Sequence, residues 1–307
     1  GTTGGTTAGD AGGDADGGGG ACGPRLNYVE VYQPNIFMVV DRSESMEGEK
    51  MRQAKQGLDT VADAIADKVR LGVAGYPMPS AGCSSRQLLE LGVHSSAEIK
   101  QSYADLTATG GTPTGIALFQ VRQGERLSDR GDAHEAKRPK AVVLITDGNP
   151  NDQKICRQTV KQATNQAAKL KEGSLDAPVY VIGYRSNADA AMLDQIAEAG
   201  GTDAPGPNKF YSAGGASELA DTILKIANNS VSCSFEIDPP VPEGASVGVK
   251  LDGQKVPRSN TDGFQYFEST ARVQITGSWC QTLQKKGEEG AALEINLFNR
   301  TEARIRA

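Results

Sequence analysis

Residues 35–45 read NIFMVVDRSES, a nearly continuous apolar run followed at once by oxygen-bearing side chains on alternate residues. An apolar run of this length is typical of a strand that is buried on both faces of a parallel sheet. Asp41, Ser43 and Ser45 follow the run at a spacing of two, so their oxygens can face one side of an extended or turning segment. At the carboxyl end of a central strand, such a segment lines the crevice in which α/β folds bind ligands.

The sequence up to residue 230 alternates apolar runs with segments of helical periodicity. Short apolar runs predict further strands at 69–76, 87–91, 141–145 and 178–182. Apolar residues at helical spacing predict helices at 48–67, 97–106, 113–126, 157–172, 189–199 and 216–229. Strands that alternate with helices indicate an α/β fold, with a doubly wound, mostly parallel sheet flanked by helices.

Two other polar segments are expected at the same edge of this sheet. The apolar run 141–145 leads to Asp147 just as residues 36–40 lead to Asp41, so neighbouring strands would place both carboxylates on one edge. The glycine-rich turn 110–115 leads into a predicted helix and can bring the hydroxyl of Thr112 to the same place.

These three segments together resemble the metal-ion-dependent adhesion site of the von Willebrand factor type A family. The matching motifs are D-x-S-x-S-M at 41–46, GGTPT at 110–114 and ITDG at 145–148. The resemblance covers about residues 30–230 and implies the Rossmann-like fold of that family. It implies that Ser43, Ser45 and Thr112 supply hydroxyl oxygens, and that Asp41 and Asp147 act directly or through water. Because every expected ligand atom is oxygen, the site suits a hard cation, Mg²⁺ or else Mn²⁺ or Ca²⁺.

Two features of these motifs have other interpretations. Ser43 and Ser45 could instead cap a helix that starts near Glu47, and residues 147–150 could be an ordinary turn. Glu44 stands where relatives often have glycine, and its carboxylate either points to solvent or weakens the attraction for an acidic ligand.

The donor set predicts a binding protein rather than an enzyme. A cation held largely by hydroxyls keeps much of its charge, and it would take a carboxylate from an Asp or Glu of a protein ligand.

The net charge of -6 and the pI of about 5.2 argue against nucleic-acid binding. The sequence contains no run of about 18 apolar residues, so it predicts no transmembrane segment. The alternative function is an intracellular subunit of an ATPase-driven assembly or metal-insertion complex.

Three regions are expected along the chain. Residues 1–24 are predicted to be a disordered tether rich in Gly, Thr and Asp, residues 30–230 the main domain, and residues 232–307 a small all-β domain stapled by a disulfide. The tether and the cysteines resemble those of bacterial surface proteins of the family. This resemblance implies an extracytoplasmic location, at the cell surface or in the periplasm and associated with the bacterial outer membrane, with a lipid anchor upstream of Gly1.

The five cysteines lack the spacing of a zinc site and indicate disulfides in an oxidising compartment. We expect Cys233 to pair with Cys280 and Cys83 with Cys156, although five cysteines allow other pairings. Cys22 is then left as a free thiol or as a link to another chain.

Two weaker signals lie outside these motifs. The tripeptide Arg130-Gly131-Asp132 matches an integrin-recognition sequence, which in a polar loop is taken as coincidence. Trp279 is expected to pack on a disulfide next to it in the sequence rather than to bind a ligand.

Overall fold

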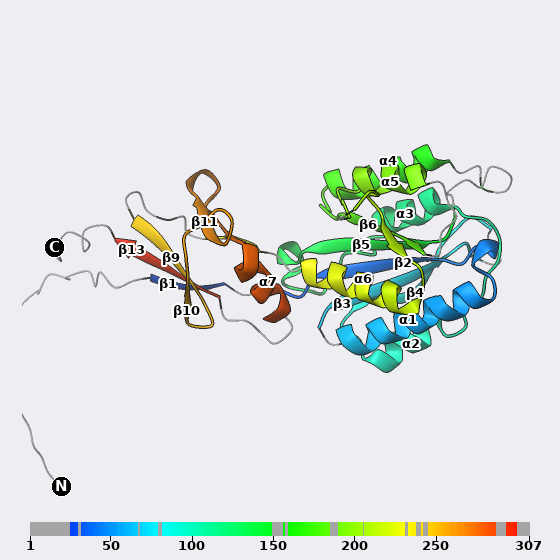
Figure 1. The fold of residues 1–307 in the computed structure, drawn as a ribbon, viewed down its shortest axis with the longest axis horizontal. Helices are drawn as coiled ribbons and strands as arrows, with labels where there is room; N and C mark the ends of the chain where they lie inside the picture. Colours follow the sequence, from blue (N-terminus) through cyan, green and yellow to red (C-terminus); the bar gives the residue numbers. More distant parts are fainter. Residues whose placement is uncertain are drawn as a thin grey trace, which may run out of the picture.

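The computed structural model describes residues 25–29, 32–66, 68–78, 82–148, 156, 159–184, 190–204, 206–230, 233–237, 241, 245–286 and 293–299. Within them, a six-stranded sheet has the order β4-β3-β2-β5-β6-β7 (Figure 1). Its strands are β2 (Asn35–Asp41), β3 (Arg70–Tyr76), β4 (Arg86–Gly92), β5 (Lys140–Thr146), β6 (Val179–Tyr184) and β7 (Tyr211–Ala213). Only β4 is antiparallel to its neighbour, so the predicted mostly parallel sheet is confirmed.

Helices cover both faces of this sheet (Figure 1). One face carries α1 (Glu49–Ile65), α2 (Ser96–Tyr103) and α6 (Ala216–Asn229), and the other carries α3 (Thr114–Gln123), α4 (Val160–Glu172) and α5 (Ala190–Ala199). Because successive side chains of a strand point to opposite faces, the apolar run of β2 serves two cores. Met38 and Val40 pack with α1 and α6, while Phe37 and Val39 pack with α3 and α4. This use of both faces explains why the run has no polar alternation.

The C-terminal part forms two small sheets and one helix. Its elements are β8 (Ser234–Glu236), β9 (Ala245–Leu251), β10 (Gln254–Val256), β11 (Gly263–Phe267), β12 (Arg272–Thr276), α7 (Gly277–Lys286) and β13 (Leu293–Asn299). A turn at Asp252 and Gly253 joins β9 to β10, and both residues have positive φ, as a two-residue hairpin with a type I′ turn requires. The disulfide expected between Cys233 and Cys280 is present, with a Cα–Cα distance of 5.7 Å.

Two features of this part differ from the expectations. A first strand, β1 (Arg25–Val29), pairs antiparallel with β13, so residues just before the main domain complete a sheet of the C-terminal part. The helix α7 stands in a region expected to be entirely β structure. Both differences arise because strand pairing and the packing of a disulfide depend on long-range contacts. The tether predicted for residues 1–24, including Cys22, lies outside the described residues.

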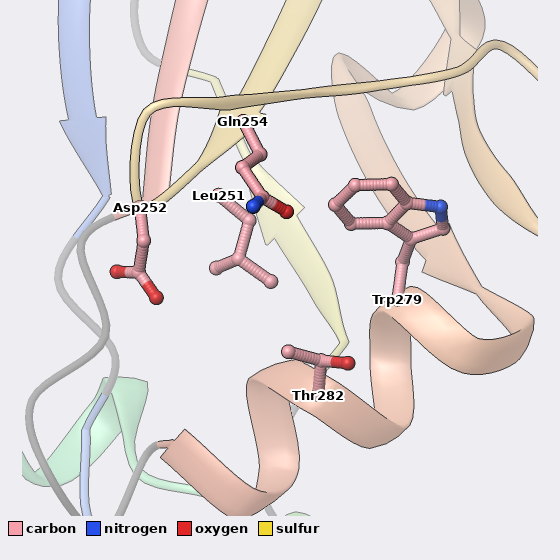
Figure 2. Close-up of a pocket in the computed structure, with 5 residues that line it drawn as sticks. All are labelled: Leu251, Asp252, Gln254, Trp279 and Thr282. Carbon is pink, nitrogen blue, oxygen red and sulfur yellow. The ribbon is translucent and has the colours of Figure 1, made fainter.

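Trp279 lies partly buried against the small core of the C-terminal part, and its packing on the neighbouring disulfide stays a prediction. Next to its indole ring is a cavity of about 130 Å³ (Figure 2). Leu251, Gln254 and Thr282 line it, together with the Asp252 turn. Pockets for small organic ligands usually measure roughly 300 Å³ or more, so this cavity is small for such a ligand.

Among the described residues, no helix combines the length and the apolar character needed to cross a membrane.

Candidate metal site

Asp41 is the last residue of β2, and its side chain is buried at the carboxyl edge of the sheet. Its Oδ1 accepts a hydrogen bond of 2.8 Å from the Ser43 amide, and its Oδ2 accepts one of 2.5 Å from the Thr146 hydroxyl. Burial, the largest cause, raises the pKa of Asp41 to about 6, and the charge of Asp147 acts in the same direction. The hydrogen bonds from Thr146 and Ser43 act against this rise. A cation close to this buried carboxylate would stabilise its charged form.

Ser43 and Ser45 lie in the segment between β2 and α1, which we call the serine loop. Ser43 Oγ lies 3.0 Å from Ser45 Oγ, and Ser45 Oγ donates to Asp147 Oδ1 over 2.7 Å. The second bond joins segments 102 residues apart, and it therefore confirms that the carboxyl ends of β2 and β5 meet. The capping alternative is wrong, because Gly48 is the N-cap of α1 and Ser43 makes no capping hydrogen bond to the short helix η1 (Glu44–Met46).

Thr112 reaches the same place from the turn before α3. The turn is fixed on the serine loop by two backbone hydrogen bonds, from the Glu44 amide to the Gly110 carbonyl (3.0 Å) and from the Thr109 amide to the Arg42 carbonyl (2.7 Å). A Cβ atom at Gly148 would lie 3.5 Å from the hydroxyl oxygens of both Ser45 and Thr112. The structure therefore brings all five predicted ligand residues to one edge of the sheet.

The chemistry of this donor set fits a hard divalent cation. Two carboxylates and three hydroxyls converge, and oxygen is the ligand atom that Mg²⁺, Mn²⁺ and Ca²⁺ prefer. In the described part of the chain, the candidate site included, no group of three or more His, Cys, Asp or Glu residues could hold a metal ion, and this site offers only two carboxylates. The hydroxyl groups therefore distinguish this site from a cluster of acidic side chains.

Two residues of the site were missed by the sequence reasoning. Thr146 lies within the matched ITDG motif, and its position as a polar residue ending a buried apolar strand was the available signal. Lys50 donates from Nζ to Asp147 Oδ2 over 2.5 Å. No motif marked Lys50, because its contact depends on the direction in which α1 leaves the loop.

Glu44, the departure from the family pattern, is exposed. Of the two interpretations left open for its carboxylate, the exposed position favours the one in which it points to solvent. Its backbone amide is nevertheless part of the contact with Gly110, so the residue contributes to the loop through its main chain.

A disulfide joins two loops at the same edge of the sheet. Cys83 follows β3 and Cys156 follows β5, and the two are bonded with a Cα–Cα distance of 5.4 Å. This confirms the second expected pairing. The bond links the segments that follow β3 and β5, the two strands that flank β2.

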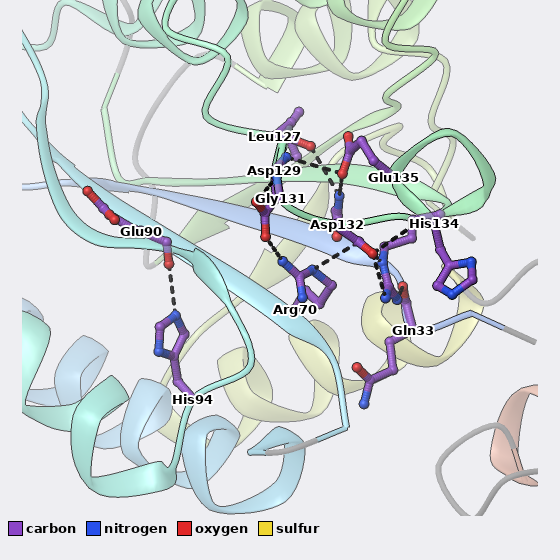
Figure 3. A network of polar contacts seen from close by, with 12 residues as sticks. Gln33, Arg70, Glu90, His94, Leu127, Asp129, Gly131, Asp132, His134 and Glu135 are labelled. Atoms are coloured by element: carbon purple, nitrogen blue, oxygen red, sulfur yellow. Dashed lines mark hydrogen bonds and ion pairs between the residues drawn. The ribbon is translucent and has the colours of Figure 1, made fainter.

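The Arg130-Gly131-Asp132 tripeptide lies elsewhere, and its Asp132 belongs to a network of ion pairs around Arg70 at the start of β3 (Figure 3). The side chain of Asp132 is only 7% exposed and pairs with both Arg138 and Arg70. Because its carboxylate is engaged inside the protein, the tripeptide does not present the aspartate that an integrin would bind. The structure therefore favours the interpretation of the tripeptide as coincidence.

Comparisons with known proteins identify the family of the domain. The family model for the von Willebrand factor type A domain matches residues 35–223. Inter-alpha-trypsin inhibitor heavy chain H4 from Sus scrofa is 23% identical over 201 residues, which make up 63% of this chain and 20% of the relative. The chain thus spans about a fifth of the length of that curated relative.

Two solved structures share the fold. The von Willebrand factor type A protein from Catenulispora acidiphila has a TM-score of 0.51 and 18% identity, with 93% of this chain and 68% of that chain covered. The pilus adhesin SpaC from Lactobacillus rhamnosus GG has a TM-score of 0.51 and 16% identity, with 88% of this chain and 40% of that chain covered. The family model covers more than half of the residues, and the chain therefore belongs to the von Willebrand factor type A domain family.

Proposed function

We propose that this protein binds a protein ligand through a divalent cation, and that the cation is held by Asp41, Ser43, Ser45, Thr112 and Asp147. The observation that carries the proposal is that three chain segments bring their side-chain oxygens to one point. The hydroxyl of Ser45 donates a hydrogen bond to Asp147, and the hydroxyls of Ser45 and Thr112 both lie near Gly148. The cation is Mg²⁺ in the first instance, with Mn²⁺ and Ca²⁺ as alternatives.

The ligand group is an Asp or Glu carboxylate. Hydroxyl oxygens carry no formal charge, so the cation receives its only protein negative charges from Asp41 and Asp147. Asp147 already shares its charge with Lys50. A cation that is incompletely neutralised in this way attracts an anionic oxygen from another molecule. The site therefore holds a partner, and we propose no catalytic reaction at it.

We place the protein outside the cytoplasm, at a bacterial cell surface or in the periplasm, where a lipid upstream of Gly1 would tether it to the outer membrane. The two disulfides support an oxidising compartment, because such bonds are rare in reducing cytosol. An intracellular subunit of an ATPase-driven complex would instead require reduced cysteines. Titration of thiols in denatured, unreduced protein should therefore find one reactive group, Cys22, or none, and five reactive thiols would favour the intracellular function.

The metal site is tested by calorimetric titration of the whole protein with Mg²⁺ and Mn²⁺. The variants Ser45→Ala and Thr112→Val each remove one hydroxyl and should weaken the affinity by at least about tenfold, since even the loss of an outer partner of a metal ligand produces that effect. Ser96→Ala is the matched control, because Ser96 is a serine on the remote helix α2. Wild-type affinity in both site variants would contradict the proposed ligand set.

The partner is tested by capture from surface extracts in the presence of Mg²⁺ or Mn²⁺. We expect wild-type protein to retain a ligand that is released by EDTA, and Asp41→Ala to retain none. The control is Asp63→Ala. It removes an exposed carboxylate that pairs with Lys100 and lies away from the site. Equal capture by wild type and Asp41→Ala, or capture that resists EDTA, would contradict a bridge through the cation.

A further inference from the structure

Lys50 occupies an unusual position at the start of α1. The helix begins at Glu49, so the Lys50 ammonium group lies in the first turn, at the end of the helix dipole that repels positive charge. The ammonium group does not extend freely into solvent, because only 26% of the Lys50 side chain is exposed. A compensating interaction is therefore expected, and the structure shows which one it is.

The compensating partner is the buried carboxylate of Asp147. Its side chain has no exposed surface, and its two oxygens have different donors: Ser45 Oγ at 2.7 Å on Oδ1 and Lys50 Nζ at 2.5 Å on Oδ2. A buried carboxylate that lost its counter-charge would be strongly destabilised, so Lys50 supplies what a cation at the site would also supply.

The path of the chain explains how Lys50 reaches this carboxylate. Gly48 has φ +72°, a conformation that other residues adopt rarely, and it ends the serine loop immediately before the helix. The turn directs the first residues of α1 back toward the carboxyl edge of β5, while Met51 and Ala54 face the core. Lys50 is thus held beside the site by the same turn that begins the helix.

We propose that Lys50 is an internal competitor of the divalent cation for Asp147, and that it sets the cation concentration at which the site fills. The inference rests on the proposed function, because it assumes that Asp147 is part of the cation site. An ammonium group and a divalent cation that share one carboxylate repel each other, so binding of the cation requires the Lys50 contact to weaken. The competition would keep a site with buried carboxylates folded at low cation concentrations and would reserve ligand binding for cation-rich surroundings.

The test compares the cation affinity of the whole protein with that of Lys50→Gln. Glutamine keeps a hydrogen-bond donor for Asp147 but removes the charge. We expect the Mg²⁺ affinity of Lys50→Gln to be about tenfold higher than that of wild type, the ratio that corresponds to about 1.4 kcal/mol of relieved repulsion. Lys50→Arg keeps the charge and should bind Mg²⁺ no more tightly than wild type. Lys55→Gln is the matched control, since it removes the same charge from the same helix at a residue whose Nζ donates to the Ala104 carbonyl instead.

A second readout follows the same variants by urea unfolding in EDTA and in Mg²⁺. Lys50→Gln should unfold at lower urea than wild type in EDTA, because Asp147 loses its counter-charge, and it should gain more stability from Mg²⁺. Equal Mg²⁺ affinities for wild type, Lys50→Gln and Lys55→Gln would overturn the competition while leaving the cation site in place. Failure of the wild-type protein to bind any of the three cations would overturn the proposed function as well.

Discussion

Asp41→Asn should stabilise the protein when no divalent cation is present. Burial raises the pKa of Asp41 from 3.8 to about 6, so the folded protein holds this proton at pH values where the unfolded chain has released it. Stability from this group is present below about pH 4 and is lost as the pH rises through about 6. The difference between the two pKa values corresponds to roughly 3 kcal/mol at neutral pH, which is an upper bound for the gain from a neutral side chain.

The hydrogen bonds of Asp41 can survive this substitution. An asparagine oxygen can accept from the Ser43 amide as the carboxylate does, and its NH₂ group can donate to the Thr146 hydroxyl. That hydroxyl can then donate to the Gly148 carbonyl, which lies 3.3 Å away. Because no buried polar atom is left without a partner, most of the electrostatic gain should appear as stability, on the order of 1–3 kcal/mol.

The cation should reverse this order. A ligand present at 1,000 times its dissociation constant stabilises the folded state by about 4.1 kcal/mol, which exceeds the gain of the variant, and Asp41→Asn should gain little of this because a charged ligand group is missing. The assay is urea unfolding at pH 7.5 and pH 4, each in EDTA and in excess Mg²⁺. We expect the variant to be more stable than wild type only in EDTA at pH 7.5. A variant less stable than wild type under that condition, or one that gains as much from Mg²⁺ as wild type does, would refute the reasoning.

Three further predictions concern residues outside the cation site. Replacing both Cys83 and Cys156 by serine should lower the free energy of unfolding by about 4 kcal/mol, because the bond closes a loop of 73 residues, and urea unfolding measures the loss. Asp132→Asn should cost roughly 2 kcal/mol at pH 7, since its ion pair with Arg138 lowers the pKa of Asp132 to about 2. The stability contributed by Asp132 is present above about pH 4 and is lost as the pH falls through about 2. The difference in free energy of unfolding between wild type and Asp132→Asn should therefore be smaller at pH 2 than at pH 7, and an equal difference at both pH values would contradict this cause. Arg130→Ala should leave cation-dependent ligand capture unchanged, and a loss of capture would revive the integrin-type tripeptide.

The sheet and its polar edge could be predicted because local patterns are sufficient for them. An uninterrupted apolar run such as residues 36–40 has to be covered on both faces, and helices between such runs supply the cover. Parallel strands also end at a common edge, so the residues that follow two such runs, Asp41 and Asp147, could be expected to meet without knowledge of any distance. The pairing of Cys83 with Cys156 followed from the same topology.

The features that escaped prediction depend on contacts between distant segments. The strand β1 carries no pattern that specifies β13 as its neighbour, although its residue Arg25 pairs with Leu297 across almost the whole chain. The helix α7 follows β12 directly, and the alternation of apolar residues in β12 gave no reason to expect a change to helical structure at Gly277. In each case the local sequence permits more than one structure, and tertiary packing selects one of them.

Lys50 changes the charge balance that determines what the proposed site attracts. The whole chain is acidic and Glu44 is exposed next to the serine loop, so a carboxylate ligand would be repelled by the protein surface alone. Asp41 and Asp147 carry two negative charges against the three positive charges of a divalent cation and the Lys50 ammonium, so the cation stays incompletely neutralised. The filled site would thus carry a local positive potential on an acidic protein, which favours an anionic anchor at that point and disfavours acidic surfaces elsewhere. Lys50→Gln should therefore bind Mg²⁺ more tightly and yet hold a carboxylate-bearing ligand less tightly. Surface plasmon resonance with the captured ligand at saturating Mg²⁺ measures the second effect, and parallel increases in both affinities would show that the residual charge plays no part in ligand choice.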